Sequence, residues 1–145
     1  METNGPPVVS SDWMDAGSGR VDVMLVESDL TLSTVLGQLL DRMGLTSRHV
    51  MTGSDAINAL TGIDPLPTPR LLLLELDAMG ADGLMVLRSL ARQQVLGKMK
   101  VVVTCSRIRD GELREAFELG AADVIPKPFS AVVLSNRLAN ILAAP

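Results

Sequence analysis

The sequence predicts an α/β fold in which a parallel sheet of five strands is covered by helices on both faces. Short apolar runs alternate with longer segments whose apolar residues recur at helical spacing, from residue 20 almost to the end of the chain. The run at 71–74 consists of four leucines, which is typical of a strand buried on both faces. It leads into two carboxylates, Glu75 and Asp77, and the carboxyl end of such a strand is where open α/β sheets bind ligands.

The first strand and the first helix are expected within residues 21–43. Residues 21–26 form an apolar, β-rich run, and residues 32–43 place their apolar side chains on one helical face. Gly44 follows at the position where a left-handed helix cap prefers glycine. The expected apolar face consists of Leu32, Val35, Leu36, Leu39, Leu40 and Met43.

The segment at 45–69 predicts a second strand, a short helix and a loop. Residues 45–51 contain several polar side chains, which favours a weaker strand near an edge of the sheet. Residues 54–60 form the short helix, with Ser54 as its N-cap. A proline-rich loop at 62–69 then leads into the leucine run.

The second half of the chain continues the alternation. Helices are expected at 83–96, 111–119 and 130–142, and strands at 100–105 and 122–125, the last one broken by Pro126. The buried faces of the last two helices are expected to consist of Leu113, Ala116 and Phe117, and of Leu134, Leu138 and Ile141.

Length, composition and charge restrict the class of protein. The 145 residues suggest a single domain at 21–143 after a small, polar tail at 1–20 that we expect to be flexible. A net charge of −4 and an aromatic content of 2% argue against a nucleic-acid surface on this domain. The first basic residue is Arg20 and no apolar run precedes it, so we expect no signal peptide and a cytoplasmic location. The one cysteine, Cys105, excludes an internal disulfide and is expected to be a small buried filler.

The strand order brings the chemistry to one crevice. Right-handed crossovers and this size favour the flavodoxin-like order 2-1-3-4-5, in which the first and third strands are neighbours. The carboxyl ends of four strands then meet and supply acids, hydroxyls and one ammonium, a set that suits a metal ion and a phosphoryl group. These side chains belong to Glu27, Ser28, Glu75, Asp77, Thr104 and Lys127.

Four short motifs follow the expected strands. They are the acidic run at 25–29, the segment at 75–83 that ends in Asp82-Gly83, the pair Thr104-Cys105, and Lys127-Pro128-Phe129. In this order and at this spacing, residues 21–142 resemble the receiver domain of two-component response regulators, the CheY-like superfamily.

The resemblance implies a role for each residue of the crevice. Glu75 takes the position of the aspartate that receives a phosphoryl group from a histidine kinase. Glu27 and Ser28 take the positions of the acidic pair that holds Mg²⁺. Thr104 and Lys127 are equivalent to the residues that contact the phosphoryl group. Val124 stands in the place of an aromatic switch residue.

This sequence departs from the family pattern at the site itself. Glu75 is one methylene longer than aspartate, which moves its carboxylate by about 1–1.5 Å, and a misplacement of about 1 Å can cost roughly a hundredfold in rate. Ser28 replaces the second acid and is a poorer ligand for Mg²⁺. Met79 replaces a proline, and Val124 replaces the aromatic residue. Phosphorylation at the usual position is therefore not expected.

The cofactor and activity predictions follow from these departures. We expect no required cofactor and no enzymatic activity. Mg²⁺ binding by Glu27, Glu75 and Asp77 is expected to be weak or absent. Asp77 would offer its backbone oxygen to the metal and turn its side chain to solvent.

Several interpretations stay open. In the first, the permanent carboxylate of Glu75 is contacted by Thr104 and Lys127, imitates phosphoaspartate and holds an active-like state. Glutamate does so with less charge and fewer oxygens than a phosphoryl group. A scaffold locked without a switch is the second interpretation. A third is an operational receiver that takes up phosphate with Mg²⁺ at Asp77 or Glu75. A flavin- or nucleotide-binding protein of this fold is disfavoured, because no glycine-rich loop follows the first strand.

Structural roles compete with the functional ones. Lys127 would then be only an ion-pair partner of Glu75 or Glu27, and Thr104 would only cap a turn. His49 is expected in an edge strand away from the acids.

The resemblance also indicates how the signal leaves the domain. We expect a protein partner to bind the surface formed by the helix at 111–119, the strand at 122–125 and the helix at 130–142, around residues 109–118 and 130–137. This route involves neither nucleic acid nor membrane. Pairing of two copies of the chain through the helix at 130–142 stays open.

Overall fold

The computed structural model describes residues 20–77, 83–107 and 109–145 of the chain. The tail predicted at 1–20 lies outside these residues except for Arg20, and so do Met79 and Asp82. No helix within the described ranges combines the length and the hydropathy that crossing a membrane requires.

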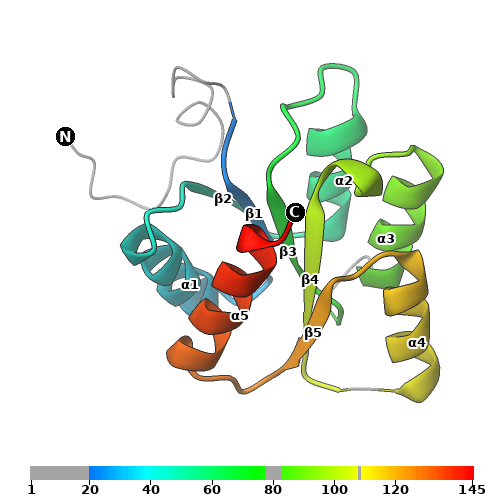
Figure 1. Cartoon of the computed structure of the whole chain (residues 1–145). Helices are drawn as coiled ribbons and strands as arrows, with labels where there is room; N and C mark the ends of the chain where they lie inside the picture. The colour runs from blue at the N-terminus through cyan, green and yellow to red at the C-terminus, as the bar shows by residue number, and fades with distance from the viewer. Residues whose placement is uncertain (1–19, 78–82, 108) are drawn as a thin grey trace.

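The strands form one parallel sheet in the order β2-β1-β3-β4-β5, which confirms the predicted topology (Figure 1). The weak second strand lies at one edge, as its polar residues indicated, and β5 lies at the other. The strands are β1 (Val23–Val26), β2 (Ser47–Val50), β3 (Leu71–Glu75), β4 (Lys100–Cys105) and β5 (Asp123–Pro126).

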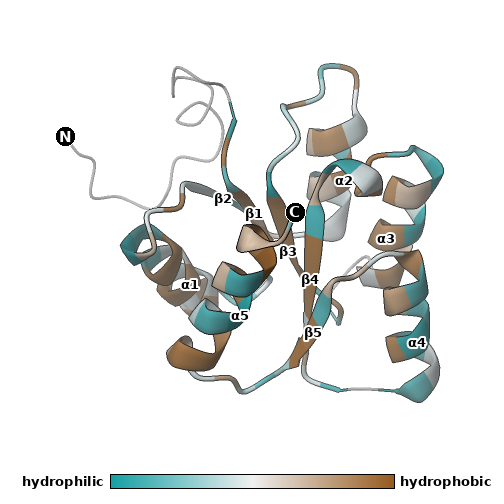
Figure 2. Ribbon diagram, in the orientation of Figure 1, coloured by the Kyte–Doolittle hydropathy of each residue, from teal (hydrophilic) through white to brown (hydrophobic). Residues whose placement is uncertain are grey.

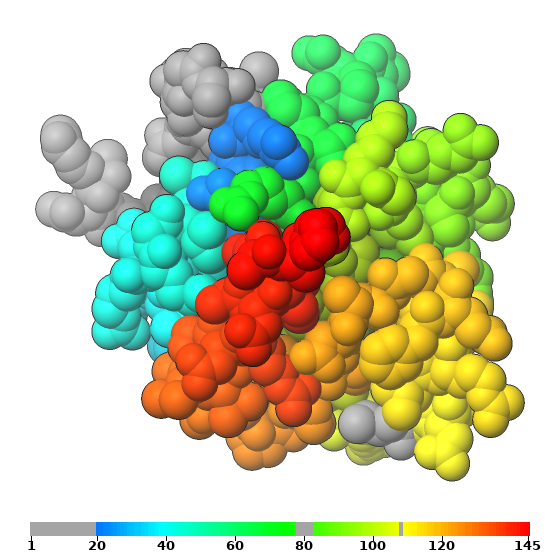
Figure 3. All heavy atoms as spheres, viewed as in Figure 1, coloured from blue at the N-terminus to red at the C-terminus, as the bar shows by residue number. Residues whose placement is uncertain are grey.

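Helices cover both faces of the sheet. One face carries α1 and α5, which lie side by side in Figure 3, and the other carries α2, α3 and α4. The helices are α1 (Leu30–Arg42), α2 (Gly53–Thr61), α3 (Gly83–Arg92), α4 (Asp110–Leu119) and α5 (Ala131–Ala143), with a short 3-10 helix at Leu96–Lys98.

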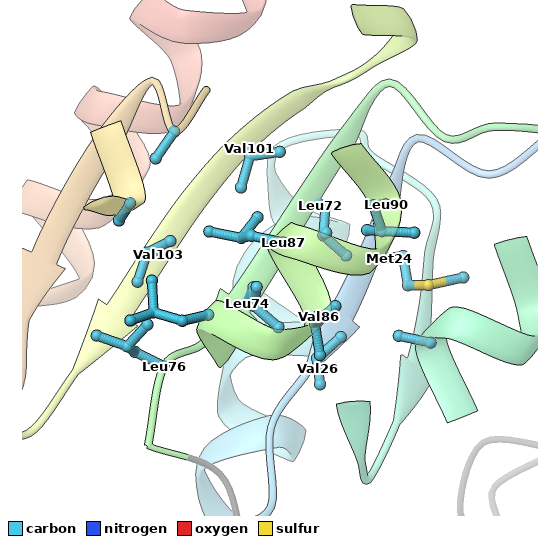
Figure 4. Close-up of a cluster of buried hydrophobic side chains, with 14 of the residues drawn as sticks. Met24, Val26, Leu72, Leu74, Leu76, Val86, Leu87, Leu90, Val101 and Val103 are labelled. Carbon is cyan, nitrogen blue, oxygen red and sulfur yellow. The ribbon is translucent and has the colours of Figure 1, made fainter. Parts of the chain in front are cut away.

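The leucine run separates two hydrophobic cores. Leu72 and Leu74 point to the face of α2, α3 and α4, where Leu87 and Leu90 of α3 pack on the sheet (Figure 4). Leu71 and Leu73 point to the face of α1 and α5. All four leucines are buried, and full burial of a leucine side chain stabilises a fold by about 1.5–3 kcal/mol. Figure 2 shows the apolar strands at the centre and the polar residues toward the outer sides of the helices.

The ends of α1 and α4 agree with the sequence pattern. The Asp29 side chain caps α1 by accepting the N–H groups of Thr31 and Leu32. Gly44 follows α1 with a φ of +78°, and Gly120 ends α4 with a φ of +118°, both in the left-handed region that favours glycine.

Two helix boundaries were predicted wrongly. The N-cap of α2 is Thr52 rather than Ser54, because extended Thr52 accepts the Asp55 N–H at 3.1 Å. The helix predicted at 83–96 ends at Arg92, because Gln94 takes a left-handed conformation with a φ of +62° that a helix cannot continue.

Three further expectations about the helices and β5 need correction. Val35 and Phe117 were expected on buried helix faces, yet their exposed fractions are 48% and 46%. Strand β5 continues through Pro126, which pairs with Cys105 in the register. Proline is tolerated there because β5 is an edge strand, where the missing N–H need not serve a neighbouring strand.

Gly83 fixes the chain segment that carries Glu75. Its N–H donates to the Leu76 carbonyl at 2.7 Å, so the start of α3 touches the end of β3. A Cβ at this position would lie 2.7 Å from the Leu76 Cα and 2.9 Å from the Glu75 carbonyl oxygen. The close approach therefore requires glycine.

Candidate functional site

Glu75 is the last residue of β3 and its side chain is buried. Its Oε1 accepts two hydrogen bonds from Ser28, one from the backbone N–H at 3.0 Å and one from the hydroxyl at 2.8 Å. Ser28 follows β1, the neighbour of β3 in the sheet, so the topology alone brings these two residues together. Ser28 therefore serves Glu75 as a donor.

Lys127 reaches the same carboxylate from the far edge of the sheet. It follows β5, and a cis peptide bond joins it to Pro128. Its Nζ lies 2.8 Å from Oε2 of Glu75 and 3.0 Å from Oε1 of Glu27. The ion pair expected with Glu75 or Glu27 is confirmed, and it forms with both at once.

Glu27 is the most buried acid of the site, with an exposed fraction of 1%. Its Oε2 accepts the Asp29 N–H at 3.1 Å. His49 lies in the edge strand β2, as predicted, and its Nε2 lies 2.7 Å from the main-chain carbonyl oxygen of Glu27, a contact with the backbone rather than with a carboxylate. Since that oxygen only accepts, Nε2 of His49 carries the proton.

Thr104 lies beside Glu75 in the sheet but does not bond to its carboxylate. The two residues are register partners, and the Thr104 side chain is buried. Its carbonyl accepts the Leu76 N–H at 2.7 Å. Over the described residues its hydroxyl makes no hydrogen bond, so the turn cap considered for Thr104 is not seen either.

Asp77 and Val124 lie beside the acid cluster rather than in it. Asp77 is exposed, as expected, and its carboxylate also accepts the Ser106 N–H at 3.0 Å and so links the loops after β3 and β4. Val124 lies within β5, partly buried against the core on the α4 side. Cys105 is buried, as predicted, and burial raises the pKa of its thiol.

The two carboxylates share one ammonium, and their pKa values move apart. Burial raises the pKa of Glu75, but the hydrogen bonds from Lys127 and Ser28 outweigh it and hold this pKa below its ordinary value. Burial keeps the pKa of Glu27 above its ordinary value, despite the hydrogen bonds from Lys127 and Asp29. Burial lowers the pKa of Lys127, but both acids outweigh that effect and raise it.

The donor set does not fit the Mg²⁺ that the resemblance implies. Mg²⁺ requires oxygen ligands at about 2.0–2.1 Å in octahedral geometry. Every carboxylate oxygen of Glu27 and Glu75 already accepts a hydrogen bond, and the ammonium of Lys127 lies between the two groups. In the part of the chain that the structure describes, no three His, Cys, Asp or Glu side chains form a group that could hold a metal.

Besides the hydrogen bonds from Ser28 to Glu75, sequence reasoning missed other contacts of the site. They include the contact of His49 with Glu27, that of the Ser106 N–H with Asp77, and that of the Asp29 N–H with Glu27. Strand order carried a signal for the first, because β2 lies beside β1 and His49 is paired with Leu25 in register. The other two depend on loop conformations for which the sequence gives no pattern.

Comparison with known proteins identifies the family to which this fold belongs. The family model described as response regulator receiver domain matches residues 23–139. The DNA-binding transcriptional regulator NtrC of Escherichia coli K12 is 30% identical over 118 residues, which cover 79% of this chain and 24% of the relative. The chain thus spans about a quarter of the length of that curated relative.

Solved structures give the same result. The receiver domain of a response regulator from Bermanella marisrubri superposes with a TM-score of 0.71 and 27% identity, over 86% of this chain and 98% of that one. The BeF3-activated N-terminal receiver domain of RstA from Klebsiella pneumoniae superposes with a TM-score of 0.71 and 26% identity, over 84% and 98%. On its fold, its motifs and these matches, the chain belongs to the response regulator receiver domain family of two-component signalling.

Proposed function

We propose that this receiver domain signals through contact with a protein partner and without phosphorylation at the position of Glu75. The proposal rests on the observation that both oxygens of the Glu75 carboxylate already accept hydrogen bonds. Ser28 holds one oxygen with two donors, and Lys127 holds the other at 2.8 Å. Attack on a phosphodonor needs a free carboxylate oxygen in line with the phosphorus, and the longer side chain misplaces this one.

The contacts of Glu75 support a domain fixed in one state more than a full imitation of phosphoaspartate. A phosphoryl group would engage both Lys127 and the Thr104 hydroxyl. Glu75 engages Lys127 and leaves the Thr104 hydroxyl aside. Glutamate also supplies one negative charge and two oxygens, whereas a phosphoryl group brings about −1.5 to −2 and three oxygens.

Mass spectrometry tests whether the domain takes up phosphate. The full chain is incubated with acetyl phosphate and Mg²⁺, and its intact mass is measured beside that of a receiver domain that autophosphorylates. We expect a gain of one phosphoryl group in the control and none in this chain. A gain in this chain would make it an operational receiver, and Glu75→Gln and Asp77→Asn would then identify the acceptor.

We place the partner on the surface of α4, β5 and α5. Helix α4 is held on α3 by a two-pronged ion pair, in which Arg88 Nε and Nη2 lie 2.5 and 2.8 Å from the Glu115 carboxylate. Phe117 of the same helix is half exposed, so a large apolar side chain is open to a partner. A large exposed aromatic side chain of this kind is a common anchor in protein interfaces.

Photo-crosslinking tests this surface, and the chain offers a matched control. Phe117 and Val35 are apolar and equally exposed, at 46% and 48%, but Val35 lies on α1. A crosslinking amino acid is placed at one or the other position in the cells that make the protein. We expect a crosslinked partner from position 117 and none from position 35. The opposite result would move the interface to α1.

A further inference from the structure

We infer that the ammonium of Lys127 takes the place of the divalent cation in this domain, so that the site is complete without Mg²⁺. The inference deepens the proposed function and rests on it, because it states why the Glu75 site stays in one state. It rests on the hydrogen bonds, the charges and the burial of three side chains, those of Glu27, Glu75 and Lys127.

Each of the four carboxylate oxygens of Glu27 and Glu75 accepts a hydrogen bond. Oε1 of Glu27 and Oε2 of Glu75 face the Lys127 ammonium at 3.0 and 2.8 Å. The other oxygen of Glu27 accepts the Asp29 N–H, and the other oxygen of Glu75 accepts both donors of Ser28. A metal ion would have to displace these donors, and a displaced donor inside the protein loses its partner.

The charges point the same way. Two carboxylates and one ammonium leave the three side chains with a net charge of −1, and a dication arriving beside the ammonium would be repelled by it. All three side chains are shielded from solvent, with exposed fractions of 14% for Lys127 and at most 8% for the acids, so water screens this repulsion poorly. Lys127 therefore acts as a resident competitor of any divalent cation.

Ser28 makes this arrangement possible. Its hydroxyl donates to Glu75, whereas an acid at the same position would present one more negative oxygen to the carboxylate at 2.8 Å. An acid there would need a cation between itself and Glu75. With serine at position 28, a hydrogen bond to Glu75 forms and no cation is needed between the two side chains.

Two variants test the inference in the full chain. Lys127→Gln removes the ammonium and leaves two carboxylates, and Ser28→Asp adds a third carboxylate. Ser28→Asn is the matched control for the second variant, because it has the same shape without the charge. The readouts are the dissociation constant for Mg²⁺ by calorimetry and the Mg²⁺-dependent rise in the thermal midpoint, at constant ionic strength.

We expect no saturable Mg²⁺ effect in the unaltered chain or in Ser28→Asn. Lys127→Gln and Ser28→Asp should each gain saturable Mg²⁺ binding, with a dissociation constant at least about tenfold below any value for the unaltered chain. Saturable Mg²⁺ binding by the unaltered chain would overturn the inference, and so would failure of both variants to gain it. Uptake of phosphate in the mass measurement is a separate result and would overturn the proposed function instead.

Discussion

Lys127 Nζ lies 2.8 Å from Oε2 of Glu75, although 52 residues separate them in the chain and a strand lies between theirs in the sheet. The same nitrogen lies 3.0 Å from Glu27 at the end of β1. One ammonium thereby joins the ends of three strands, so we expect its removal to affect the stability of the fold.

Replacing Lys127 by Met should destabilise the fold by about 3–5 kcal/mol, because two buried carboxylates lose their shared counter-charge. Urea unfolding at neutral pH measures the change. Lys98→Met provides the control, since Lys98 is exposed and its replacement should alter the free energy of unfolding by less than about 0.5 kcal/mol. Equal effects of the two substitutions would mean that the bridge contributes nothing to stability.

Stability should decline in alkali because of Lys127. Its pKa is raised in the folded state, so the bridge stabilises the fold fully below about pH 10.4 and is lost as the pH rises through the raised value. We expect a decline that begins near the ordinary pKa of lysine, about pH 10.4, and continues above it in the unaltered chain, and a weaker one in Lys127→Met. The chain has no Tyr. Lys127 also lowers the pKa of the Cys105 thiol, so both proteins are compared in a Cys105→Ala background, where the difference between the two curves isolates Lys127. Parallel curves would contradict the assignment.

Gly83→Ala should destabilise the fold by about 1–3 kcal/mol, because the added methyl meets the backbone of Glu75 and Leu76. Gly37→Ala is its control. Gly37 lies inside α1 with nothing within 4 Å of an added Cβ, so alanine there should stabilise the fold by about 0.5–1 kcal/mol. Thermal and urea unfolding of the two variants should therefore move in opposite directions.

Thr104→Val should leave the free energy of unfolding within about 1 kcal/mol of the original, because the hydroxyl makes no hydrogen bond to the described residues. Partner binding should also persist, since Glu75 is held by Ser28 and Lys127. Thr104→Ala should cost more stability, because it leaves a cavity beside the sheet. Loss of partner binding in Thr104→Val would show that the hydroxyl takes part in an active-like state.

The fold was predictable because its signals are local and repeated. Four leucines in a row between turn residues are typical of a strand between two helix layers, and β4 was placed at its observed limits, residues 100–105. The wrong boundaries arise where one backbone conformation decides the outcome. Gln94 ends α3 by a left-handed turn that any sequence pattern would have overlooked.

The candidate site was predictable as a set but not as a network. Parallel strands bring Glu27, Glu75 and Lys127 to one edge, and these three do meet. Which oxygen meets which donor depends on side-chain rotamers, and these selected Ser28 and left Thr104 aside. The exposure of Phe117 was missed for a related reason, since helical spacing defines a face only to within about a quarter turn.

Strand β5 ends on Pro126, and this affects how the domain meets other chains. Alternate N–H groups of an edge strand point away from the sheet, and since the Lys127 N–H donates inward to Cys105, the outward positions are 124 and 126. Proline has no N–H, and the Val124 N–H donates to the Asp123 side chain at 2.8 Å. Neither position of this edge strand therefore offers an N–H donor to an incoming strand. Exposed edge strands with free N–H groups are where proteins associate edge to edge. Pairing of two copies edge to edge through β5 would therefore lack the donors at these two positions that extend a sheet.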